Sequence, residues 1–245
     1  MLFLINLDSA CERRARMEAQ LASLGLVFRR VGIDFRGRSR EAIDAWLDAN
    51  LTGVTFDHTS VSSAEIGCWV SHLSAWQALA ASNQPSCAVL EDDLMLDDAL
   101  PQAVAALRER LPRDLVFLGT SCRNVSTRRR ESVGNFTLHR PIGTIYNTWG
   151  YVVSRAWVER FFAACPWHID RPIDHYTGGS RAGAVRPQTA VLRPPVVSED
   201  EALGPLSQIE PYTYRIDRSR LVERARRRIL ASRLSELYYR LYRFF

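Results

Sequence analysis

Residues 87–93 read Cys-Ala-Val-Leu-Glu-Asp-Asp, a short apolar run that ends abruptly in three acidic side chains. An apolar run of this length, bounded by polar residues, predicts a fully buried strand. In an open α/β sheet, ligands bind outside the carboxyl ends of the strands. The triplet Glu91-Asp92-Asp93 therefore predicts a negatively charged site at one edge of a sheet.

The start of the chain predicts the same kind of sheet. Residues 2–7 have the length and apolarity of a strand, and residues 10–24 predict a helix that Asp8 or Ser9 could cap and that ends at Gly25. A second strand is expected over residues 27–33. Strand, helix and strand at this spacing indicate a βαβ unit. We therefore predict an α/β fold, a mostly parallel Rossmann-type sheet flanked by helices.

Further elements follow along the chain. Ser62-Ser63-Ala64-Glu65 has the capping-box pattern and predicts a helix to about Ala81. Helices are also expected over 41–50, from just after Asp98 to about 111, and from Ser154 to 164, with strands over 115–118 and 151–153. Residues 120–140 are polar and Arg-rich and predict a loop, and residues 166–208 predict three or four short elements.

The charge of the chain is uneven. Residues 215–245 hold ten Arg and three acidic residues, about +7, whereas the whole chain carries +5, so the first 214 residues sum to about −2. We expect one domain over 1–214 and a basic amphipathic helix over 215–245. Such a helix can lie on an anionic membrane or pack on the body, and these two interpretations are compatible.

Cysteine usage and hydropathy bear on the location. The five cysteines are widely spaced without a Cys-x-x-Cys pair, which argues against a disulfide framework or a zinc site and favours free thiols in a reducing cytoplasm. The first residues do not have the pattern of a signal peptide, and no apolar run is long enough to span a bilayer. We expect a cytoplasmic protein, with peripheral contact at the inner face of the inner membrane if residues 215–245 bind lipid.

Two chemical interpretations are open for the triplet. In an extended segment, Glu91 and Asp93 point to one side and Asp92 to the other, so Glu91 and Asp93 could share a site. Mg²⁺ and Mn²⁺ prefer such oxygen ligands and often bridge carboxylates to a diphosphate. The alternative is a solvated acidic loop that caps the next helix.

Two further groups of residues could contribute chemistry. Glu65 and His72 lie two helical turns apart and share a face, although Glu65 could be only the capping partner and His72 a core residue. Gly67, between them, permits the close approach of another backbone. Asp174 and His175 are adjacent in a predicted loop and could serve as base, metal ligand or sugar binder.

The order of these motifs resembles glycosyltransferase family 25, the lipooligosaccharide glycosyltransferases of Gram-negative bacteria. The resemblance covers about residues 2–210. The motifs that carry it are Ile5-Asn6-Leu7 with Arg13-Arg14, residues 64–68 with 71–73, residues 89–93, residues 146–154, residues 172–174 and residues 207–209.

The resemblance implies a GT-A type fold, a nucleotide-sugar donor and a divalent cation, Mn²⁺ or Mg²⁺. Such enzymes commonly transfer galactose from UDP-galactose with inversion, here to a lipooligosaccharide, lipopolysaccharide or other glycan or glycolipid acceptor. Asp93 would be the direct metal ligand, supported by Glu91 or Asp92, and Asp174 the general base. His175 would be a base or a further metal ligand.

The same resemblance places a larger set of residues in the donor site. Arg13 or Arg14 could pair with phosphate. The expected donor-site residues are Asn6, Leu7, Arg13, Arg14, Asp34, Glu65, His72 and Asp92. The triplet departs from a strict Asp-x-Asp motif, which leaves open which pair of carboxylates binds the metal.

Two other functions remain as alternatives. A metal-dependent nucleotidyltransferase or phosphohydrolase shares the acidic edge, but such folds usually show a Gly-rich phosphate loop or a nucleophilic Asp near the first strand. A nucleic-acid-binding protein could use the Arg-rich residues 215–245. The slightly acidic body argues against it, because a nucleic-acid footprint normally lies on the folded domain, and we expect no nucleic-acid partner.

Overall fold

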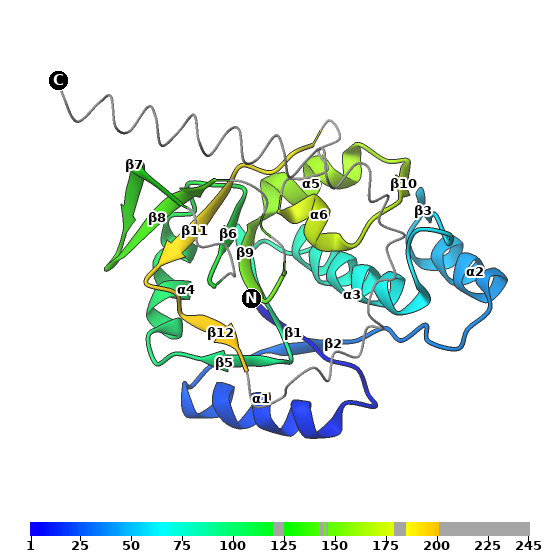
Figure 1. Ribbon diagram of the computed structural model, residues 1–245, viewed down its shortest axis with the longest axis horizontal. Helices are drawn as coiled ribbons and strands as arrows, with labels where there is room; N and C mark the ends of the chain where they lie inside the picture. The colour runs from blue at the N-terminus through cyan, green and yellow to red at the C-terminus, as the bar shows by residue number, and fades with distance from the viewer. Residues whose placement is uncertain (120–124, 143–144, 146, 179–184, 201–245) are drawn as a thin grey trace, which may run out of the picture. The chain divides into compact units, whose positions relative to one another are not determined.

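In the computed structural model, the described residues are 1–119, 125–142, 145, 147–178 and 185–200. They form a mixed α/β fold in which a large sheet is covered by helices on both faces (Figure 1). The predicted basic helix over 215–245, the domain boundary at 214 and the motif at 207–209 lie outside these residues. Within them, no helix is both long and apolar enough to cross a membrane.

The main sheet has eight strands in the order β2-β1-β4-β9-β6-β11-β8-β7. Their bounds, in that order, are Arg29–Val31, Leu2–Ile5, Ser86–Glu91, Gly150–Ser154, Leu115–Phe117, Thr189–Arg193, Phe136–Pro141 and Val125–Val133. β1 pairs in parallel with β2 and β4, which confirms the predicted parallel unit at the start of the chain.

The centre of the sheet departs from the expected mostly parallel arrangement. β9 lies between β4 and β6 and runs antiparallel to both, and β8 runs antiparallel to β11. A strand that is buried on both faces is apolar whichever way it runs. The apolar composition of Tyr151-Val152-Val153 therefore predicted a buried strand but could not determine its direction.

The predicted loop over residues 120–140 is wrong where the structure describes it. β7 and β8 form an antiparallel hairpin whose turn contains Gly134 at a φ of 53°. Val133, Phe136 and Leu138 are buried, whereas Arg130 and Arg140 are exposed. The polar face of the hairpin concealed the alternation that is typical of a half-buried strand.

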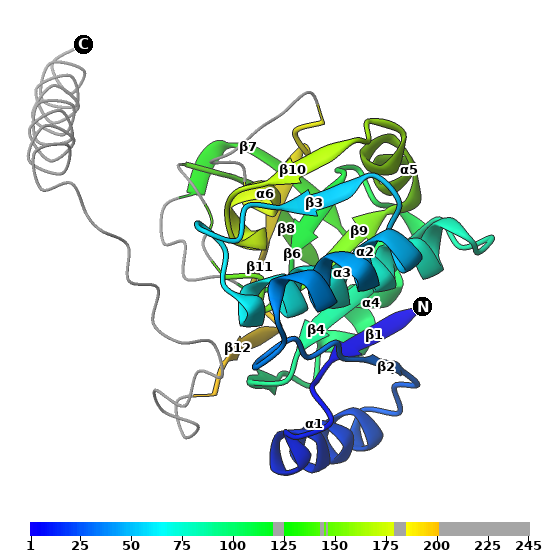
Figure 2. The same ribbon diagram turned by 90° about the vertical axis from the view of Figure 1, so that its right-hand side faces the viewer.

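The helices cover the two faces of the sheet separately. α1 (Cys11–Ser23) and α4 (Leu100–Glu109) pack on one face. α3 (Ser63–Ala80), α5 (Arg155–Ala163), α6 (Ile173–Thr177) and α2 (Arg40–Asn50) build the core of the other. Figure 2 shows α1 and α3 on opposite sides of β1 and β4.

Two small sheets complete the described structure. β3 (Val54–Phe56) pairs in parallel with β10 (Trp167–Ile169). β5 (Leu94–Leu96), directly after the acidic triplet, pairs antiparallel with β12 (Val197–Glu199). The predicted short elements of residues 166–208 are thus β10, α6, β11 and β12 in the described part.

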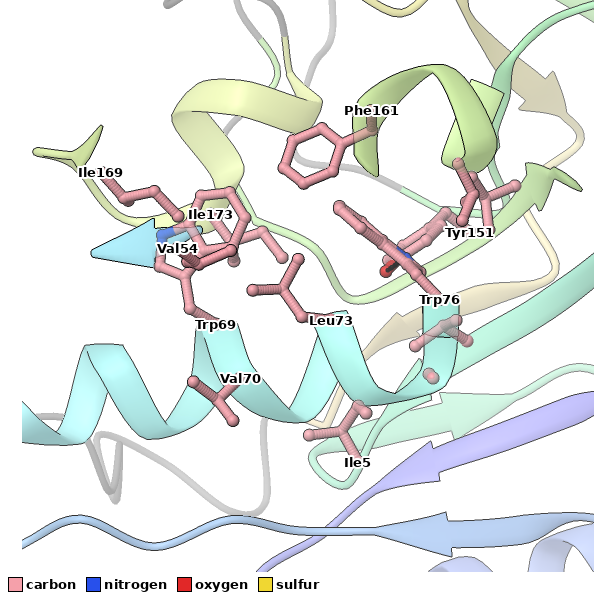
Figure 3. Packing of buried hydrophobic residues seen from close by; sticks show 14 of the residues in the cluster. Ile5, Val54, Trp69, Val70, Leu73, Trp76, Tyr151, Phe161, Ile169 and Ile173 are labelled. Carbon is pink, nitrogen blue, oxygen red and sulfur yellow. Dashed lines mark hydrogen bonds between the residues drawn. The ribbon is translucent and has the colours of Figure 1, made fainter. Parts of the chain in front are cut away.

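α3 is the central helix of the larger core. It is buried on nearly all sides, as expected for a helix that is apolar all round. Its tryptophans, Trp69 and Trp76, pack edge-on against each other, and Trp76 also packs edge-on against Trp157 and Phe161 of α5 (Figure 3). This aromatic packing fixes α3 against α5 in the larger core.

The start of α3 confirms the predicted capping box. The Ser62 hydroxyl accepts a hydrogen bond from the Glu65 N–H at 3.3 Å, and the Glu65 carboxylate accepts one from the Ser62 N–H at 2.7 Å. The predicted cap of α1 at Asp8 or Ser9 is wrong, because α1 begins after Ala10 without a side-chain cap.

Replacing Ser62 by Ala should lower the free energy of unfolding by about 1 kcal/mol, because the Glu65 N–H at the start of α3 loses its side-chain acceptor. Urea unfolding of the wild type and the variant measures the difference. Ser23→Ala is the control, since Ser23 is exposed and its hydroxyl donates to a carbonyl at the end of α1. Equal midpoints for the wild type and Ser62→Ala would contradict the prediction.

Candidate active site

The acidic triplet lies at the carboxyl end of β4, where the sequence predicted it. β4 ends at Glu91, whose backbone pairs with Ile5 of β1, and Asp92 and Asp93 form the turn into β5. Asn6 follows β1 at the same edge, and its side chain is 1% exposed. The edge of two neighbouring parallel strands therefore carries the candidate site, as the general rule for α/β sheets predicts.

Asp92 forms an ion pair on the α1 side of the sheet. Its Oδ2 accepts a hydrogen bond from Asn6 Nδ2 at 2.7 Å, and its Oδ1 lies 3.1 Å from an Arg13 guanidinium nitrogen. The side chains of Arg13 and Asp92 are only 12% and 13% exposed. Because both oxygens have donors, Asp92 fits the role of a partner of α1 better than that of a metal ligand.

Glu91 points to the other side, toward α3. Its Oε1 accepts a short hydrogen bond from the Thr148 hydroxyl and lies 3.4 Å from His72 Nε2. Thr148 precedes β9, the strand paired with β4. The triplet thus divides between the two faces of the sheet, Asp92 toward α1 and Glu91 toward α3, in line with the alternation expected of an extended segment.

Asp93 has the electrostatics of a cation ligand. Burial, followed by the charges of Glu91 and Asp92, raises the pKa of Asp93 to about 7. Its buried Oδ1 has no hydrogen-bond partner in the described part of the chain. Since buried polar groups are almost always satisfied in folded proteins, an orphaned carboxylate oxygen at a strand end fits a bound cation.

Asp174 is placed on the short helix α6 and not in the predicted loop. Burial raises the pKa of Asp174 above its usual value, and its Oδ1 is buried without a hydrogen-bond partner among the described residues. Its Oδ2 accepts a long hydrogen bond, 3.4 Å, from the Asn147 N–H. Asn147 has a φ of 82°, a conformation that residues other than glycine adopt rarely and often at functional sites.

Four carboxylates surround one turn of α3. Burial raises the pKa of Cys68 well above its usual value, and the next causes are the negative charges of Glu91, Asp174, Glu65 and Asp93. Acidic side chains from the end of β4, the turn after it, α3 and α6 therefore lie close enough to Cys68 to affect its charge, although these segments are far apart in the sequence.

Several residues that hold this site together were missed or undervalued in the sequence. Thr148 and Asn147 were noted only within a family-like segment, yet they contact Glu91 and Asp174 respectively. The N–H of Asp200, at the end of β12, donates to the Asp93 carbonyl at 2.9 Å, and its carboxylate pairs with Arg16. No spacing in the sequence pointed to Asp200, because strand pairing alone brings it to Asp93.

Gly67 confirms the predicted close approach to another backbone. A Cβ at this position would lie 2.6 Å from the Ile33 carbonyl oxygen. Beside it, the Ser71 hydroxyl accepts a hydrogen bond from the Ile33 N–H at 2.9 Å. Gly67 and Ser71 therefore fix α3 against the segment that follows β2.

Some expected donor-site residues have other partners in the structure. The Asp34 carboxylate forms a salt bridge with Arg36 at 2.5 Å, whose hydrogen bond lowers the pKa of Asp34. Arg14 lies 3.8 Å from Glu18 on the exposed side of α1. Glu65 accepts the capping-box hydrogen bonds, and the Leu7 carbonyl accepts one from Ala10.

His72 is fully buried beneath the site, at 0% exposure, and His175 lies on α6 next to Asp174. The interpretation of His72 as a core residue therefore fits better than direct contact with a donor molecule.

The oxygen ligands of the site fit the hard cations expected from the sequence. Asp93, with its orphaned oxygen, and Glu91 are the carboxylates that could hold Mn²⁺ or Mg²⁺. A second, mixed group also exists, since donor atoms of Cys68, His72 and Glu91 lie within 4.8 Å of one another. Glu91 belongs to both groups.

The structure thus combines a mixed α/β sheet with an acidic site at the carboxyl ends of β1 and β4. The model of "Glycosyltransferase family 25 (LPS biosynthesis protein)" matches residues 1–177. The chain belongs to glycosyltransferase family 25. The matched region contains the triplet, α3 and Asp174.

Curated relatives agree with this assignment. The chain is 29% identical over 182 residues to a glycosyltransferase 25 family member of Aedes aegypti, covering 71% of this chain and 30% of that protein. It is 24% identical over 183 residues to procollagen galactosyltransferase 2 of Mus musculus, with coverages of 71% and 29%. It is 26% identical over 183 residues to a probable inactive glycosyltransferase 25 family member 3 of Rattus norvegicus, with coverages of 71% and 32%.

The chain spans about a third of the length of these relatives. The family includes members named as galactosyltransferases and members named as inactive. Membership of the family alone therefore does not establish activity, and the carboxylates of this chain decide it.

Proposed function

We propose that this chain is an active, metal-assisted glycosyltransferase that moves a hexose from a nucleotide sugar to a glycan acceptor. The donor we propose is UDP-galactose, used with inversion, and the acceptor a lipooligosaccharide, lipopolysaccharide or related glycolipid. One observation carries the proposal: Asp93, in the turn after β4, and Asp174 of α6 each have a buried carboxylate oxygen without a hydrogen-bond partner among the described residues, and both lie near Cys68 of α3. The galactosyltransferase names among the relatives support the choice of sugar.

Asp93 and Glu91 are the residues that would hold Mn²⁺ or Mg²⁺. Such a cation, when bound, neutralises the charge that develops on the departing diphosphate. Asn6, Leu7 and Arg13 lie at the carboxyl end of β1 and the start of α1, and we assign them to the nucleotide. The ion pair of Arg13 with Asp92 orients this guanidinium at the edge of the sheet.

Asp174 is the residue we assign as the general base. In the displacement, the acceptor hydroxyl oxygen bonds to the anomeric carbon, the bond from that carbon to the diphosphate breaks, and the hydroxyl proton passes to Asp174. A base is most effective when its pKa lies near the working pH, and burial moves the pKa of Asp174 in that direction. His175, adjacent on α6, is a second candidate for the base or for a metal ligand.

We also propose a cytoplasmic location, with residues 215–245 contacting the anionic membrane that carries the acceptor. Ten arginines in this segment support electrostatic attraction to such a surface.

The proposal is tested by incubating the protein with a panel of nucleotide sugars and Mn²⁺ and following the release of free nucleoside diphosphate. We expect turnover with one sugar, UDP-galactose, and a loss of at least about 100-fold for Asp93→Asn, because the variant lacks the charge that holds the cation. Asp98→Asn is the matched control, since Asp98 is an exposed acid shortly after the triplet. Release of inorganic phosphate from simple nucleotides, or equal rates for the wild type and Asp93→Asn, would overturn the proposal.

A further inference from the structure

A chain of buried polar contacts runs beneath Glu91. The indole N–H of Trp76 donates to the Tyr151 hydroxyl at 3.0 Å, and that hydroxyl lies 2.7 Å from His72 Nδ1. His72 Nε2 in turn lies 3.4 Å from Glu91 Oε1. Trp76, Tyr151 and His72 are all 0% exposed, and Figure 3 shows Trp76 and Tyr151 side by side in the core.

The fold places these side chains together by simple periodicity. His72 and Trp76 are four residues apart on α3 and share a face of the helix. Tyr151 of β9 pairs with Val89 of β4, and Glu91, two residues after Val89, is expected on the same face of the sheet. That face is the one packed against α3.

The direction of the hydrogen bonds follows from the chemistry of the donors. An indole N–H can only donate, so the Tyr151 oxygen accepts from Trp76. Burial raises the pKa of Tyr151 well above its usual value, so its hydroxyl keeps its proton. The acceptor within hydrogen-bonding distance of that proton is His72 Nδ1. If Nδ1 accepts, the ring hydrogen of neutral His72 is on Nε2, the nitrogen that faces Glu91.

We propose that His72 is a positioning residue, held by Tyr151 and Trp76 in the tautomer whose hydrogen is on Nε2. This nitrogen lies 3.4 Å from Glu91 Oε1 and makes no hydrogen bond among the described residues, so its action on Glu91 is electrostatic. The hydroxyl of Thr148, just before the neighbouring strand β9, donates a hydrogen bond to the same oxygen. The hydrogen bond from Thr148 and the electrostatic attraction of the nearby Nε2–H group favour one orientation of the Glu91 carboxylate, with Oε2 as the oxygen that remains for a ligand. The importance of this orientation for catalysis rests on the proposed function, in which Glu91 supports the cation.

The same atoms allow a competing arrangement, a metal ion held by Cys68, His72 and Glu91. A metal on His72 Nε2 would require the hydrogen on Nδ1, and the Tyr151 oxygen would then accept from both Trp76 and His72. The Tyr151 hydrogen would lose His72 as its acceptor inside the core, at a cost typical of a buried unsatisfied donor. The Trp76–Tyr151–His72 hydrogen bonds therefore favour the positioning role, whereas Nε2, which makes no hydrogen bond among the described residues, would gain a partner in the metal site; the measured tautomer decides between the two.

The tautomer itself can be measured without any activity. Long-range ¹H–¹⁵N NMR of the side chains distinguishes the two ring nitrogens of each of the five histidines, and His72→Gln assigns the signal of His72. We expect neutral His72 with its hydrogen on Nε2. A hydrogen on Nδ1, or a sulfur-to-cobalt charge-transfer band on adding Co²⁺ that disappears in Cys68→Ser but not in Cys165→Ser, would overturn the proposal.

The effect on the site is tested with a matched pair of variants. The side-chain nitrogen of Gln reaches the place of Nε2 and can still donate to Glu91, whereas that of Asn reaches only the place of Nδ1. Mn²⁺ binding, followed by the loss of the free-ion EPR signal, should weaken by about 10-fold in His72→Asn, as for other residues that orient metal ligands, and remain near the wild-type value in His72→Gln. Equal affinities for the wild type and His72→Asn, or equal losses in both variants, would contradict the positioning role.

Two further measurements separate the possible failures. Should His72→Asn fail to fold, Tyr151→Phe provides the second variant. It keeps the ring and removes the hydroxyl, and we expect His72 to populate the other tautomer and Mn²⁺ binding to weaken. An unchanged tautomer in Tyr151→Phe would contradict the proposal. If the wild type binds no Mn²⁺, the proposed function fails, whereas the tautomer of His72 still decides the inference about this residue.

Discussion

Asp174→Asn should lower kcat by about 10²–10⁴-fold and leave the KM for the nucleotide sugar near the wild-type value. The amide keeps the size of the side chain and the hydrogen bond from the Asn147 N–H, but it cannot accept the proton of the acceptor hydroxyl. The measurement is steady-state transfer with the donor identified by the panel. Asp170→Asn is the matched control, because Asp170 precedes α6 by a few residues and accepts a hydrogen bond from Tyr176.

The pH dependence gives a second view of the same residue. A base acts in its ionised form, so the rate should be highest above the pKa of Asp174 and fall as the pH decreases through it. Burial raises this pKa, so the acidic limb should lie at higher pH than for an exposed aspartate. A full rate in Asp174→Asn together with a large loss in His175→Gln would instead assign the base to His175.

The strand and helix positions that the sequence predicted well are those set by local chemistry. The capping box of Ser62 and Glu65, the Ser154 cap of α5 and the apolar run of β4 all involve neighbouring residues. Such patterns depend on contacts within a few residues and are visible without the rest of the chain. The direction of β9 and the β7–β8 hairpin depend on partners distant in the sequence, so local patterns could not determine them.

For the site as well, the sequence predicted what depends on neighbouring residues and not what depends on distant partners. The triplet and Asp174 could be selected because acids at element ends suggest chemistry, and the structure brings Glu91, Asp93 and Asp174 near Cys68 of α3. The sequence did not indicate that Asp92 would be taken by Arg13 and Asn6, or that His72 would lie under Glu91. These pairings depend on which face of the sheet each side chain meets, and that is set by the strand order and by the packing of α1 and α3.

Asp93→Asn should make the metal-free protein more stable at pH 8, by up to about 4 kcal/mol, while it removes activity. The pKa of Asp93 is raised from its ordinary value of 3.8 to about 7 in the folded protein. The folded state therefore binds more protons than the unfolded state between these values, and stability falls as the pH rises through this window. The difference of about three pKa units corresponds to about 4 kcal/mol, an upper limit for a group that is partly exposed.

Urea unfolding at pH 5 and pH 8 in the presence of a chelator tests this expectation. The wild type should lose more stability between the two pH values than Asp93→Asn, whereas Asp98→Asn should behave like the wild type. Saturating Mn²⁺ should restore the wild type at pH 8 and have little effect on Asp93→Asn, because a ligand stabilises only a folded state that binds it. Equal losses of stability between pH 5 and pH 8 in the wild type and in Asp93→Asn would show that the pKa of Asp93 is not raised in the folded protein. If Asp93→Asn is more stable than the wild type but inactive, the Asp93 carboxylate lowers the stability of the metal-free protein and is needed for activity. This is expected of a buried, charged residue that binds a cation.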